Sequence, residues 1–425
     1  MRDKQIKNFE DLATTENRRD ALAIMEAGLK SINTENVILN SVRLQDDVLS
    51  IMGESFVLSK YKNIKIVGFG KSSCEGAIAL EKILGDKIKE GVVIGLSKVI
   101  CDNIEIFAGT HPRPSEANVE AGKKIYEIAK NSTEDDLIIA LVSGGGSALL
   151  CYGDEECVQG VKLYDAFLNS GKTITEMNTV RKHLSLLKGG GLAKIAYPAT
   201  VIGLIFSDVP GDNFADVASG PTYKDVTTIA DAEKIIAKNN LGEFKLIETP
   251  KEDKYFEKVH NFVLVSNTTA AQAMAEKGKE LGLATKIVST ELYDKGDDAI
   301  QKIFNAKGEN TLVLAAGEPK IEVKDKSGKG GRNTHLSLQV LNNKIIDENS
   351  VFISFASDGQ DNSDVAGAVV DKNTIEKAQK LNLNSEEYLN NFDSYNFFAK
   401  TGDLIITGPT GANVSDLMVL LTKKP

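Results

Sequence analysis

The sequence has few of the features that mark secreted, membrane-spanning or disordered chains. Its 425 residues include only 4 cysteines, 9 prolines and 4 histidines. The first 20 residues are polar and contain no apolar signal core, and no run approaches the roughly 20 apolar residues of a membrane helix. No biased tract favours disorder, since the composition is that of an ordinary globular protein. We therefore expect a chain that folds in water.

An excess of positive charge is also missing. Asp and Glu number 60 against 50 Lys and Arg, which gives a net charge of -10. A protein that binds a nucleic-acid backbone needs a basic face, so this class is disfavoured. An anionic ligand would have to be bound locally, by particular Lys, Arg or backbone N–H groups.

The cysteines show neither a C-x-x-C pair nor the spacing of metal ligands. They are Cys74, Cys101, Cys151 and Cys157. In a chain of this length the pattern predicts reduced, mostly buried thiols and a cytoplasmic protein.

What the sequence does contain is an alternation of apolar runs and helix-like segments. Each run ends in Gly, Ser, Asp or Thr, as in IKIVGFGKSS, GVVIGLS, LIIALVSGGGS, TVIGLIFSDVPGD, FVLVSNTT, TLVLAAGEP, VFISFASDGQD and DLIITGPTGAN. This pattern predicts buried parallel strands in a doubly wound α/β fold, whose ligands bind beyond the carboxyl ends of the strands. The charged segment 239–261 is a candidate linker or a surface hairpin, so we expect domains over 1–245 and 260–425.

The segment Leu141–Leu150 runs from such a strand into three glycines and a serine. Neither Ser143 nor Ser147 has the glycine spacing of a nucleophile elbow, and Leu149 breaks the dinucleotide-binding fingerprint. Two interpretations remain, a strand-to-helix turn whose N–H groups bind an anion and the same turn without a ligand.

A second glycine-rich turn lies in Val67–Ser73. Lys65 stands where a P-loop requires its first glycine, so a P-loop is excluded. Lys71 nevertheless follows a strand and precedes a helix start, a good position for a cation that faces a phosphate or a carboxylate.

Basic residues gather in Asn178–Ala193, where we expect a helix. They are Arg181, Lys182, His183 and Lys188. Helical spacing would place Arg181, Ser185 and Lys188 on one side. The group is either a substrate clamp or a solvated helix face.

Aspartates follow two further strands. Asp208 and Asp212 flank a Pro-Gly turn, and the second loop carries Asp358, Asp361 and Asp364. Carboxylates at such positions suit Mg²⁺ or a general base, although Asp is also a common turn former.

The remaining candidates lie in the C-terminal half. Glu318 follows a strand, and a basic, glycine-rich loop leads from it to Arg332 and Asn333, where the guanidinium can bind a phosphate or a carboxylate. The last glycine-rich segment offers Thr407, Gly408, Thr410 and Asn413 as hydrogen-bonding groups.

Taken in order, eight blocks resemble the class II glycerate kinase family, the glycerate 2-kinases with a MOFRL domain. The blocks are GFGKSS, HPRPSE, VSGGGSALL, NTVRKHLSLLKGGGLA, SDVPGDNFADVASGPT, GKGGRN, SDGQDNSDVAGAVVD and TGPTGANVSDLMVLL. The resemblance implies a Rossmann-like N-terminal domain, a smaller α/β C-terminal domain and an active site between them. It also implies phosphorylation of the 2-hydroxyl of D-glycerate, with ATP and Mg²⁺, to give 2-phosphoglycerate.

The resemblance carries the family's key lysine to Lys71 and its key arginine to Arg332. Asp208 or Asp212 would then act on the attacking hydroxyl or hold the metal, with Asp358 as another metal ligand. Further groups for substrate or nucleotide are Gly70, Ser72, Ser143, Gly144, Gly145, Gly146, Ser147, Arg181, Lys188, Glu318, Asn333, Thr407, Thr410 and Asn413. We expect a small-molecule substrate, no nucleic acid or membrane partner, and a monomer or a homodimer.

The chain departs from the family pattern at five positions. Thr334 and His335 replace Gln-Glu, Gly191 replaces a basic residue, Ser357 replaces Thr, and Asn362 replaces Gly. Because charge changes near the site, a related hydroxy acid stays open as the substrate. A hydrolase or isomerase using Ser147 or His183, and a non-catalytic sensor of an anionic metabolite, are the other hypotheses.

Overall fold

A computed structural model describes residues 4–168, 174–209, 213–323 and 328–424. The chain divides into two compact units, which we describe separately. The N-terminal unit comprises residues 34–264, and the C-terminal unit comprises residues 265–425 together with 1–33. Along the described ranges, no helix is both long and apolar enough to cross a membrane.

The N-terminal unit is built on a six-stranded sheet in the order β6-β5-β4-β7-β8-β9. Its strands are β4 (Asn63–Phe69), β5 (Ile88–Gly95), β6 (Glu105–Ala108), β7 (Asp136–Ser143), β8 (Thr200–Phe206) and β9 (Val259–Val265). In this order, the neighbouring strands β6, β5, β4, β7 and β8 all pair in parallel, as the sequence predicts. Every residue of β7 and β8 is buried. This burial explains their continuous apolar runs, since helices cover both faces of such a sheet.

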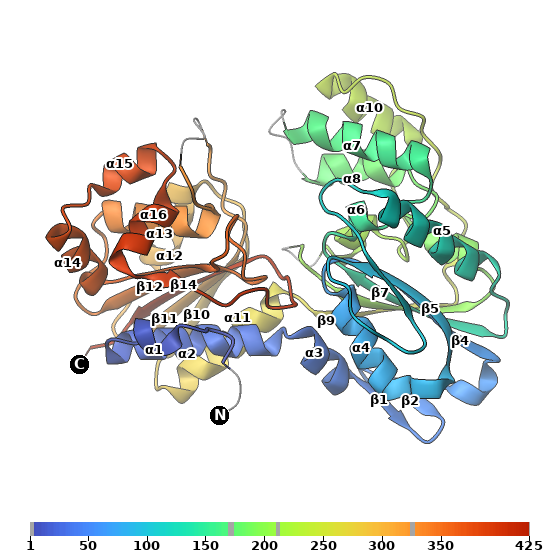
Figure 1. Ribbon diagram of the computed structural model, residues 1–425, viewed down its shortest axis with the longest axis horizontal. Helices are drawn as coiled ribbons and strands as arrows, with labels where there is room; N and C mark the ends of the chain where they lie inside the picture. The colour runs from blue at the N-terminus through green and yellow to red at the C-terminus, as the bar shows by residue number, and fades with distance from the viewer. Residues whose placement is uncertain (1–3, 169–173, 210–212, 324–327, 425) are drawn as a thin grey trace. The chain divides into compact units, whose positions relative to one another are not determined.

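Helices of the N-terminal unit pack on this sheet and above its carboxyl edge (Figure 1). They are α3 (Thr34–Ser41), α4 (Ser73–Leu84), α5 (Glu116–Lys130), α6 (Gly146–Leu149), α7 (Asp154–Leu168), α8 (Ile174–Lys182), α9 (Gly191–Ala196) and α10 (Ile229–Asn239). A small antiparallel sheet, β1 (Val42–Gln45), β2 (Val48–Ile51) and β3 (Glu54–Val57), completes the unit. At this edge, α4 begins after the short turn that follows β4, and α5 begins after the loop that follows β6.

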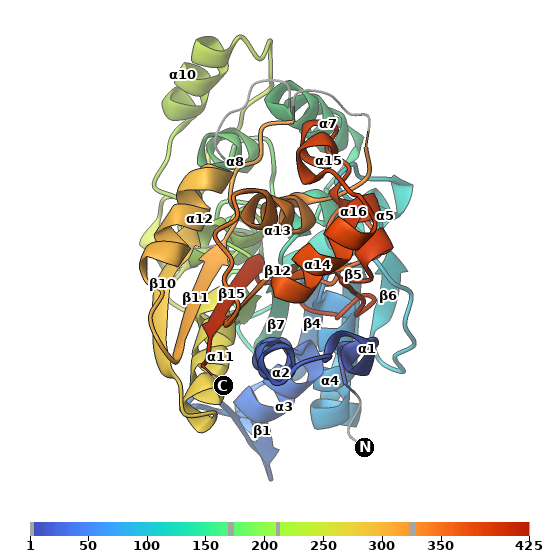
Figure 2. The ribbon, with the colours of Figure 1, turned by 90° about the vertical axis from the view of Figure 1, so that its left-hand side faces the viewer.

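The C-terminal unit is built on a second six-stranded sheet, in the order β10-β11-β15-β12-β13-β14 (Figure 2). The strands are β10 (Ala284–Leu292), β11 (Thr311–Gly317), β12 (Ser350–Ala356), β13 (Gly367–Val370), β14 (Leu404–Ile405) and β15 (Asp416–Thr422). Only β10 and β11 pair in parallel, and the other pairs are antiparallel. The expectation of parallel strands is therefore wrong for most of this sheet, because β15 lies between β11 and β12 and runs opposite to both.

Helices lie on both faces of the second sheet (Figure 1). One face carries α12 (Gly296–Asn305), α13 (Arg332–Asn342), α14 (Lys372–Lys380), α15 (Ser385–Asn390) and α16 (Ser394–Thr401). The other face carries α11 (Asn267–Glu280) and the N-terminal helices α1 (Phe9–Leu12) and α2 (Glu16–Ser31).

The first 33 residues thus pack with the C-terminal unit, whereas the sequence analysis assigned them to the N-terminal domain. The guanidinium of Arg18, which is fully buried, donates to both carboxylate oxygens of Asp371 and to Asp403 at 2.8 Å. A buried ion pair of this kind needs both partners in place. The boundary between the units falls after Leu264, within β9 of the first sheet and three residues beyond the segment 239–261.

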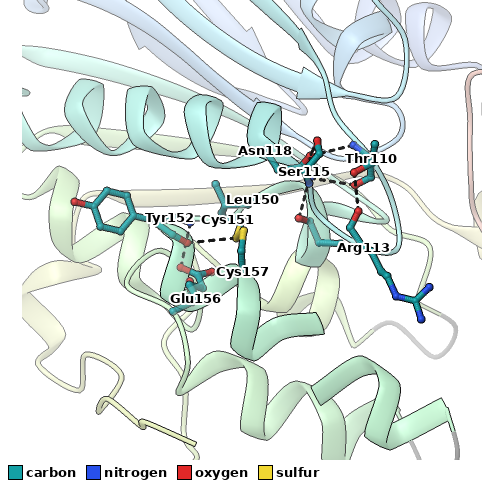
Figure 3. The surroundings of a disulfide bond; sticks show 12 residues. Thr110, Arg113, Ser115, Asn118, Leu150, Cys151, Tyr152, Glu156 and Cys157 are labelled. Atoms are coloured by element: carbon teal, nitrogen blue, oxygen red, sulfur yellow. Dashed lines mark hydrogen bonds between the residues drawn. A yellow bond between two sulfur atoms is a disulfide. The ribbon is translucent and has the colours of Figure 1, made fainter. Parts of the chain in front are cut away.

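The expectation of four reduced cysteines is also wrong. Cys151 and Cys157 form a disulfide between the end of α6 and the first turns of α7, and Cys74 and Cys101 are free (Figure 3). The Cα atoms of Cys151 and Cys157 lie 6.0 Å apart, a separation that a disulfide can bridge. The spacing of six residues matches no motif, so no pattern in the sequence predicts this pair.

Candidate active site

The turns that follow β4 and β7 interlock, because these strands are parallel neighbours. The amide of Lys71 donates to the carbonyl of Gly144 at 2.8 Å, and the amide of Ser72 donates to the hydroxyl of Ser143 at 3.1 Å. Gly70 has a φ of +128°, and a Cβ there would lie 2.2 Å from the Ser143 hydroxyl. The predicted binding residues Gly70, Ser72 and Ser143 therefore join the two turns and fix the position of Lys71.

The glycines after β7 bring three chemically active side chains together. A Cβ on Gly144 would lie 1.9 Å from a carboxylate oxygen of Asp208, which follows β8. A Cβ on Gly145 would lie 3.2 Å from both Lys71 Cγ and His111 Cδ2. Only residues without side chains allow this approach, and the φ of +78° at Gly145 also favours glycine.

His111 lies in the loop between β6 and α5, which a buried asparagine holds (Figure 3). Asn118 accepts a hydrogen bond from the amide of Thr110 at 3.0 Å and donates to its carbonyl at 3.1 Å. Burial, together with the smaller effects of the Lys71 and Arg181 charges, lowers the pKa of His111 to about 4. His111 is therefore neutral at pH 7 and feels the charge of both cations. The sequence analysis quoted the block HPRPSE without choosing this residue.

Arg181 lies in a pocket beside these glycines. The pocket is lined by Pro112, Pro114, Ser147, Ala148, Cys151, Glu156, Cys157, Gly160, Tyr164, Arg181, Leu184 and Lys188. The Arg181 guanidinium donates to Asn178 at 3.2 Å, and within the described ranges no carboxylate pairs with it. Burial lowers the pKa of Arg181 to about 10, opposed only by Tyr164. A half-buried arginine without a carboxylate partner is well suited to bind an anionic ligand.

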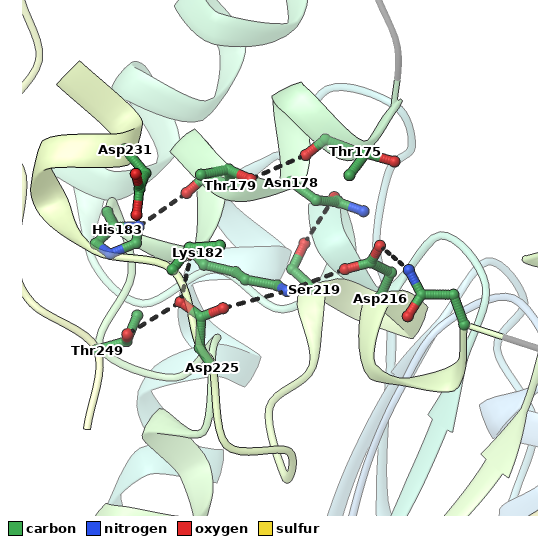
Figure 4. A network of polar contacts seen from close by, with 12 residues as sticks. Thr175, Asn178, Thr179, Lys182, His183, Asp216, Ser219, Asp225, Asp231 and Thr249 are labelled. Carbon is green, nitrogen blue, oxygen red and sulfur yellow. Dashed lines mark hydrogen bonds and ion pairs between the residues drawn. The ribbon is translucent and has the colours of Figure 1, made fainter. Parts of the chain in front are cut away.

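The other basic residues of this segment have internal partners. Lys182 lies 2.9 Å from an oxygen of Asp216 and 3.5 Å from one of Asp225 (Figure 4). His183 contacts the carbonyl of Thr179 at 2.8 Å and the carboxylate of Glu248 at 3.2 Å. These two residues therefore stabilise the fold and are not part of a clamp.

Lys188 is predicted to bind substrate and lines the same pocket as Arg181. It forms an ion pair with Glu156 and donates to the carbonyl of Leu150 at 2.7 Å. Burial lowers the pKa of Lys188, and Glu156 opposes this effect. The expected long helix is wrong, since α8 ends at Lys182, and a turn rather than helical spacing brings Lys188 near Arg181.

Ser147 also lines the pocket, and its hydroxyl lies 2.8 Å from that of Ser219. Ser219 in turn donates to Asn178 at 3.2 Å, the residue that accepts from Arg181. His183 is bound to other partners, so the structure provides no Ser147–His183 pair for a nucleophile and its base.

The C-terminal unit carries a second polar cluster at one edge of its sheet. Gly317 at the end of β11 and Ala356 at the end of β12 both lie opposite Asp416, the first residue of β15. The guanidinium of Arg332 donates to Asp416 and, at 3.3 Å, to Glu318. Asn333 donates to Asp416 at 2.9 Å and accepts from Ser354. Three of the residues predicted in this half, Glu318, Arg332 and Asn333, are therefore brought together.

Asp416 was not among the predicted site residues, although it lies in the last of the eight blocks. Burial raises its pKa to about 7, while the charge of Arg332 acts in the opposite direction. Burial lowers the pKa of Arg332, but the charges of Asp416 and Glu318 outweigh this effect and raise the pKa overall. A carboxyl with a pKa near 7 is well placed to exchange protons at neutral pH.

The second aspartate loop has mostly structural contacts. Asp361 accepts from the amides of Asn333 and Thr334 and so caps α13. Asp364 pairs with Lys329 at 3.2 Å, and Asp358 accepts from the amide of Gln360 at 3.0 Å. In the loop before β15, the hydroxyls of Thr407 and Thr410 donate to the carbonyls of Gly408 and Ser357, and Asn413 accepts from the amide of Ser415.

The metal predictions rest on single carboxylates. In the parts of the chain that the structure describes, no group of three or more His, Cys, Asp and Glu side chains could hold a metal. Asp212 lies outside the described residues. Mg²⁺ commonly takes one or two protein carboxylates and completes its shell with water and phosphate. Asp208, whose carboxylate lies against the Gly144 turn, fits this pattern.

Two departures from the family pattern have local explanations. A Cβ on Gly191 would lie 2.0 Å from the carbonyl oxygen of Leu186, so this backbone has room only for glycine. Asn362 has a φ of +50°, the left-handed conformation that asparagine tolerates, as expected.

The chain is similar to known proteins over most of its length. Residues 20–246 match the family described as "Domain of unknown function (DUF4147)", and residues 311–416 match the MOFRL family. A glycerate 2-kinase of Pyrococcus horikoshii is 33% identical, over 95% of this chain and 97% of its own. A putative hydroxypyruvate reductase of Agrobacterium vitis is 35% identical, over 84% and 86%. The crystal structure of a Thermotoga maritima glycerate kinase aligns with a TM-score of 0.82 and 30% identity, over 95% of this chain and 99% of that one.

Proposed function

The chain belongs to the class II glycerate kinase family, and we propose that it transfers the γ-phosphoryl group of ATP to the 2-hydroxyl of D-glycerate, giving 2-phosphoglycerate. The observation that carries this proposal is Arg181, a guanidinium without a carboxylate partner in the described chain. It lies near Lys71, since the charges of both act on His111. Two cations in one region suit a substrate whose carboxylate lies next to the hydroxyl that receives the phosphoryl group.

Phosphoryl transfer depends mainly on positioning and on the stabilisation of charge. In this proposal the planar fork of Arg181 binds the glycerate carboxylate in a bidentate manner. Lys71, fixed beside Gly145, stabilises the charge of the migrating phosphoryl group. Arg332, at the start of α13 in the C-terminal unit, is proposed separately as a cation that binds phosphate oxygens.

Asp208 has two possible tasks in this reaction. Its carboxylate lies against Gly144, where it can accept the proton of the attacking hydroxyl or hold Mg²⁺. When bound, Mg²⁺ would neutralise charge on the phosphate oxygens of ATP. A cytoplasmic location remains part of this proposal.

An assay of ADP release tests the proposal directly. We expect turnover with D-glycerate and ATP that depends on Mg²⁺, and weaker turnover with other hydroxy acids. Glycerol, which lacks the carboxylate, should react poorly because Arg181 has nothing to bind. Oxidation of a nicotinamide cofactor with hydroxypyruvate, without any release of ADP from ATP and glycerate, would reject the kinase in favour of a reductase.

A further inference from the structure

The C-terminal unit contains a pocket that is not part of the Arg332 cluster. It encloses about 500 Å³, within the range of roughly 300–1,000 Å³ that is typical of small-molecule sites. It lies among α12, α13 and the chain around α15, and no residue of the Arg332 cluster lines it. The lining residues are Lys295, Gly296, Asp297, Lys320, Ile321, Glu322, His335, Gln339, Asn342, Asn343, Leu389, Asn390 and Phe392.

Two polar atoms in this pocket have no protein partner among the described residues. They are Nδ1 of His335 and Oε1 of Gln339, and both atoms are buried. The side chains are four residues apart on α13, so they lie on the same face of the helix. His335 is only 8% exposed. Because buried polar atoms nearly always have a hydrogen-bond partner, this pair indicates a ligand with complementary groups.

The pocket offers a neutral interior for that ligand. Burial lowers the pKa of His335 to about 4, so its ring carries no charge at pH 7. Lys295 and Glu322 lie 3.2 Å apart and neutralise each other. A neutral ligand, or the neutral part of a larger one, is therefore favoured over a bare anion.

The walls of the pocket suit a flat ring. The rings of His335 and Phe392 are nearly parallel, at 13°, with centroids 5.2 Å apart. Ile321 supplies an apolar surface. A Cβ on Gly296 would lie 2.6 Å from the unpaired oxygen of Gln339, so only glycine leaves room for this oxygen at that position.

We propose that this pocket binds the adenine ring of a nucleotide, with Gln339 Oε1 accepting from the exocyclic amine and the His335 ring donating to the adjacent ring nitrogen. Adenine presents an amine donor next to a nitrogen acceptor, which matches these two groups. The proposal rests on the proposed function in one respect, because ATP is then the natural source of the base. Arg332 begins the same helix one turn earlier, where it can meet the phosphates.

Calorimetric titration of the full chain with adenosine tests the binding without any turnover. Gln339→Leu removes the acceptor and keeps the bulk, and we expect it to weaken adenosine binding at least about 10-fold. Gln379→Leu is the matched control, because Gln379 is exposed on α14 and does not line the pocket. His335→Phe keeps a ring but removes its N–H, and circular dichroism checks that each variant folds. Guanosine should bind more weakly than adenosine, because it presents a carbonyl oxygen to Gln339.

Equal affinity of Gln339→Leu and the wild type for adenosine would overturn the proposal, as would equal binding of guanosine and adenosine. Because no glycerate is present, adenosine binding with no kinase activity would reject the proposed function and leave this inference standing. A raised KM for ATP in Gln339→Leu, with the KM for glycerate unchanged, would support the pocket as the site of the phosphate donor. An unchanged KM for ATP with adenosine binding lost would support it as a site for a separate, regulatory nucleotide.

Discussion

The guanidinium of Arg332 donates a hydrogen bond to the carboxyl of Asp416, whose pKa burial raises to about 7. This relationship ties a residue at the start of α13 to the first residue of β15. Arg332, which was predicted from the sequence, is therefore bound to a carboxyl whose charge changes close to neutral pH.

Replacing this carboxyl should change how stability depends on pH. A raised pKa in the folded state means that Asp416 contributes stability fully below its unfolded pKa of about 3.9 and loses it as the pH rises toward 7. Relative to wild type, Asp416→Asn should gain unfolding free energy between pH 4 and 7, by at most about 1.4 kcal/mol per pH unit. Denaturant unfolding of the full chain at several pH values measures this gain.

Asp364→Asn is the control for that experiment. Asp364 is exposed, and hydrogen bonds, including one from Lys329, lower its pKa. Its removal should give no such gain as the pH rises. A flat difference between Asp416→Asn and wild type would show that Asp416 has an ordinary pKa.

Loss of the cation beside the glycine turn should reduce turnover without affecting the fold. Lys71→Met removes the charge that we assign to the migrating phosphoryl group, so kcat should fall by about 100-fold or more. Lys89→Met, at an exposed position of β5, should leave kcat unchanged. Steady-state kinetics and circular dichroism provide the two readouts, and normal kcat in Lys71→Met would contradict the assigned role.

Arg181 should act on the binding of the carboxylate. For Arg181→Met we expect the KM for glycerate to rise by roughly 10- to 100-fold, because a charged hydrogen-bonded contact is lost. The KM for ATP should stay close to that of wild type. Arg181→Lys should restore part of the affinity, since it returns the charge but not the planar fork. If ATP binding falls instead, Arg181 faces the nucleotide.

The pKa of His111 should report the two neighbouring cations. Burial is the largest of the effects that lower this pKa to about 4, and the charges of Lys71 and Arg181 are the smaller ones. In Lys71→Met and in Arg181→Met, the pKa should rise but stay below the ordinary value of about 6.5. NMR titration of the histidine ring measures this shift. Identical titration curves in the variants and the wild type would place both cations farther from His111.

Two glycines should respond in opposite ways to alanine. Gly191→Ala places a Cβ against the carbonyl of Leu186 and should destabilise the protein by about 1–3 kcal/mol. Gly160 lies within helix α7, and a Cβ there meets nothing within 4 Å. Gly160→Ala should therefore stabilise by about 0.5–1 kcal/mol. Thermal unfolding compares the two, and a stable Gly191→Ala would show that this backbone can shift.

The sequence predicted most of the first sheet because β4, β7 and β8 are buried on both faces and each forms one apolar run, whereas the short and partly exposed β6 was not among the runs. It did not predict the strand order of the second sheet, since β15 joins β11 and β12 from a distant part of the chain. Lys71 and Arg332 could be chosen from local setting alone. His111 and Asp416 could not, because their importance comes from neighbours that only the fold supplies.

The buried contact of Arg18 with Asp371 and Asp403 has a consequence for synthesis of the chain. Helix α2 is synthesised before residues 34–264, yet its partners are made only after them. The N-terminal unit can fold during translation, since its residues are contiguous. The C-terminal unit can complete its fold only after residues 265–425 have been made, and until then α2 lacks its partners.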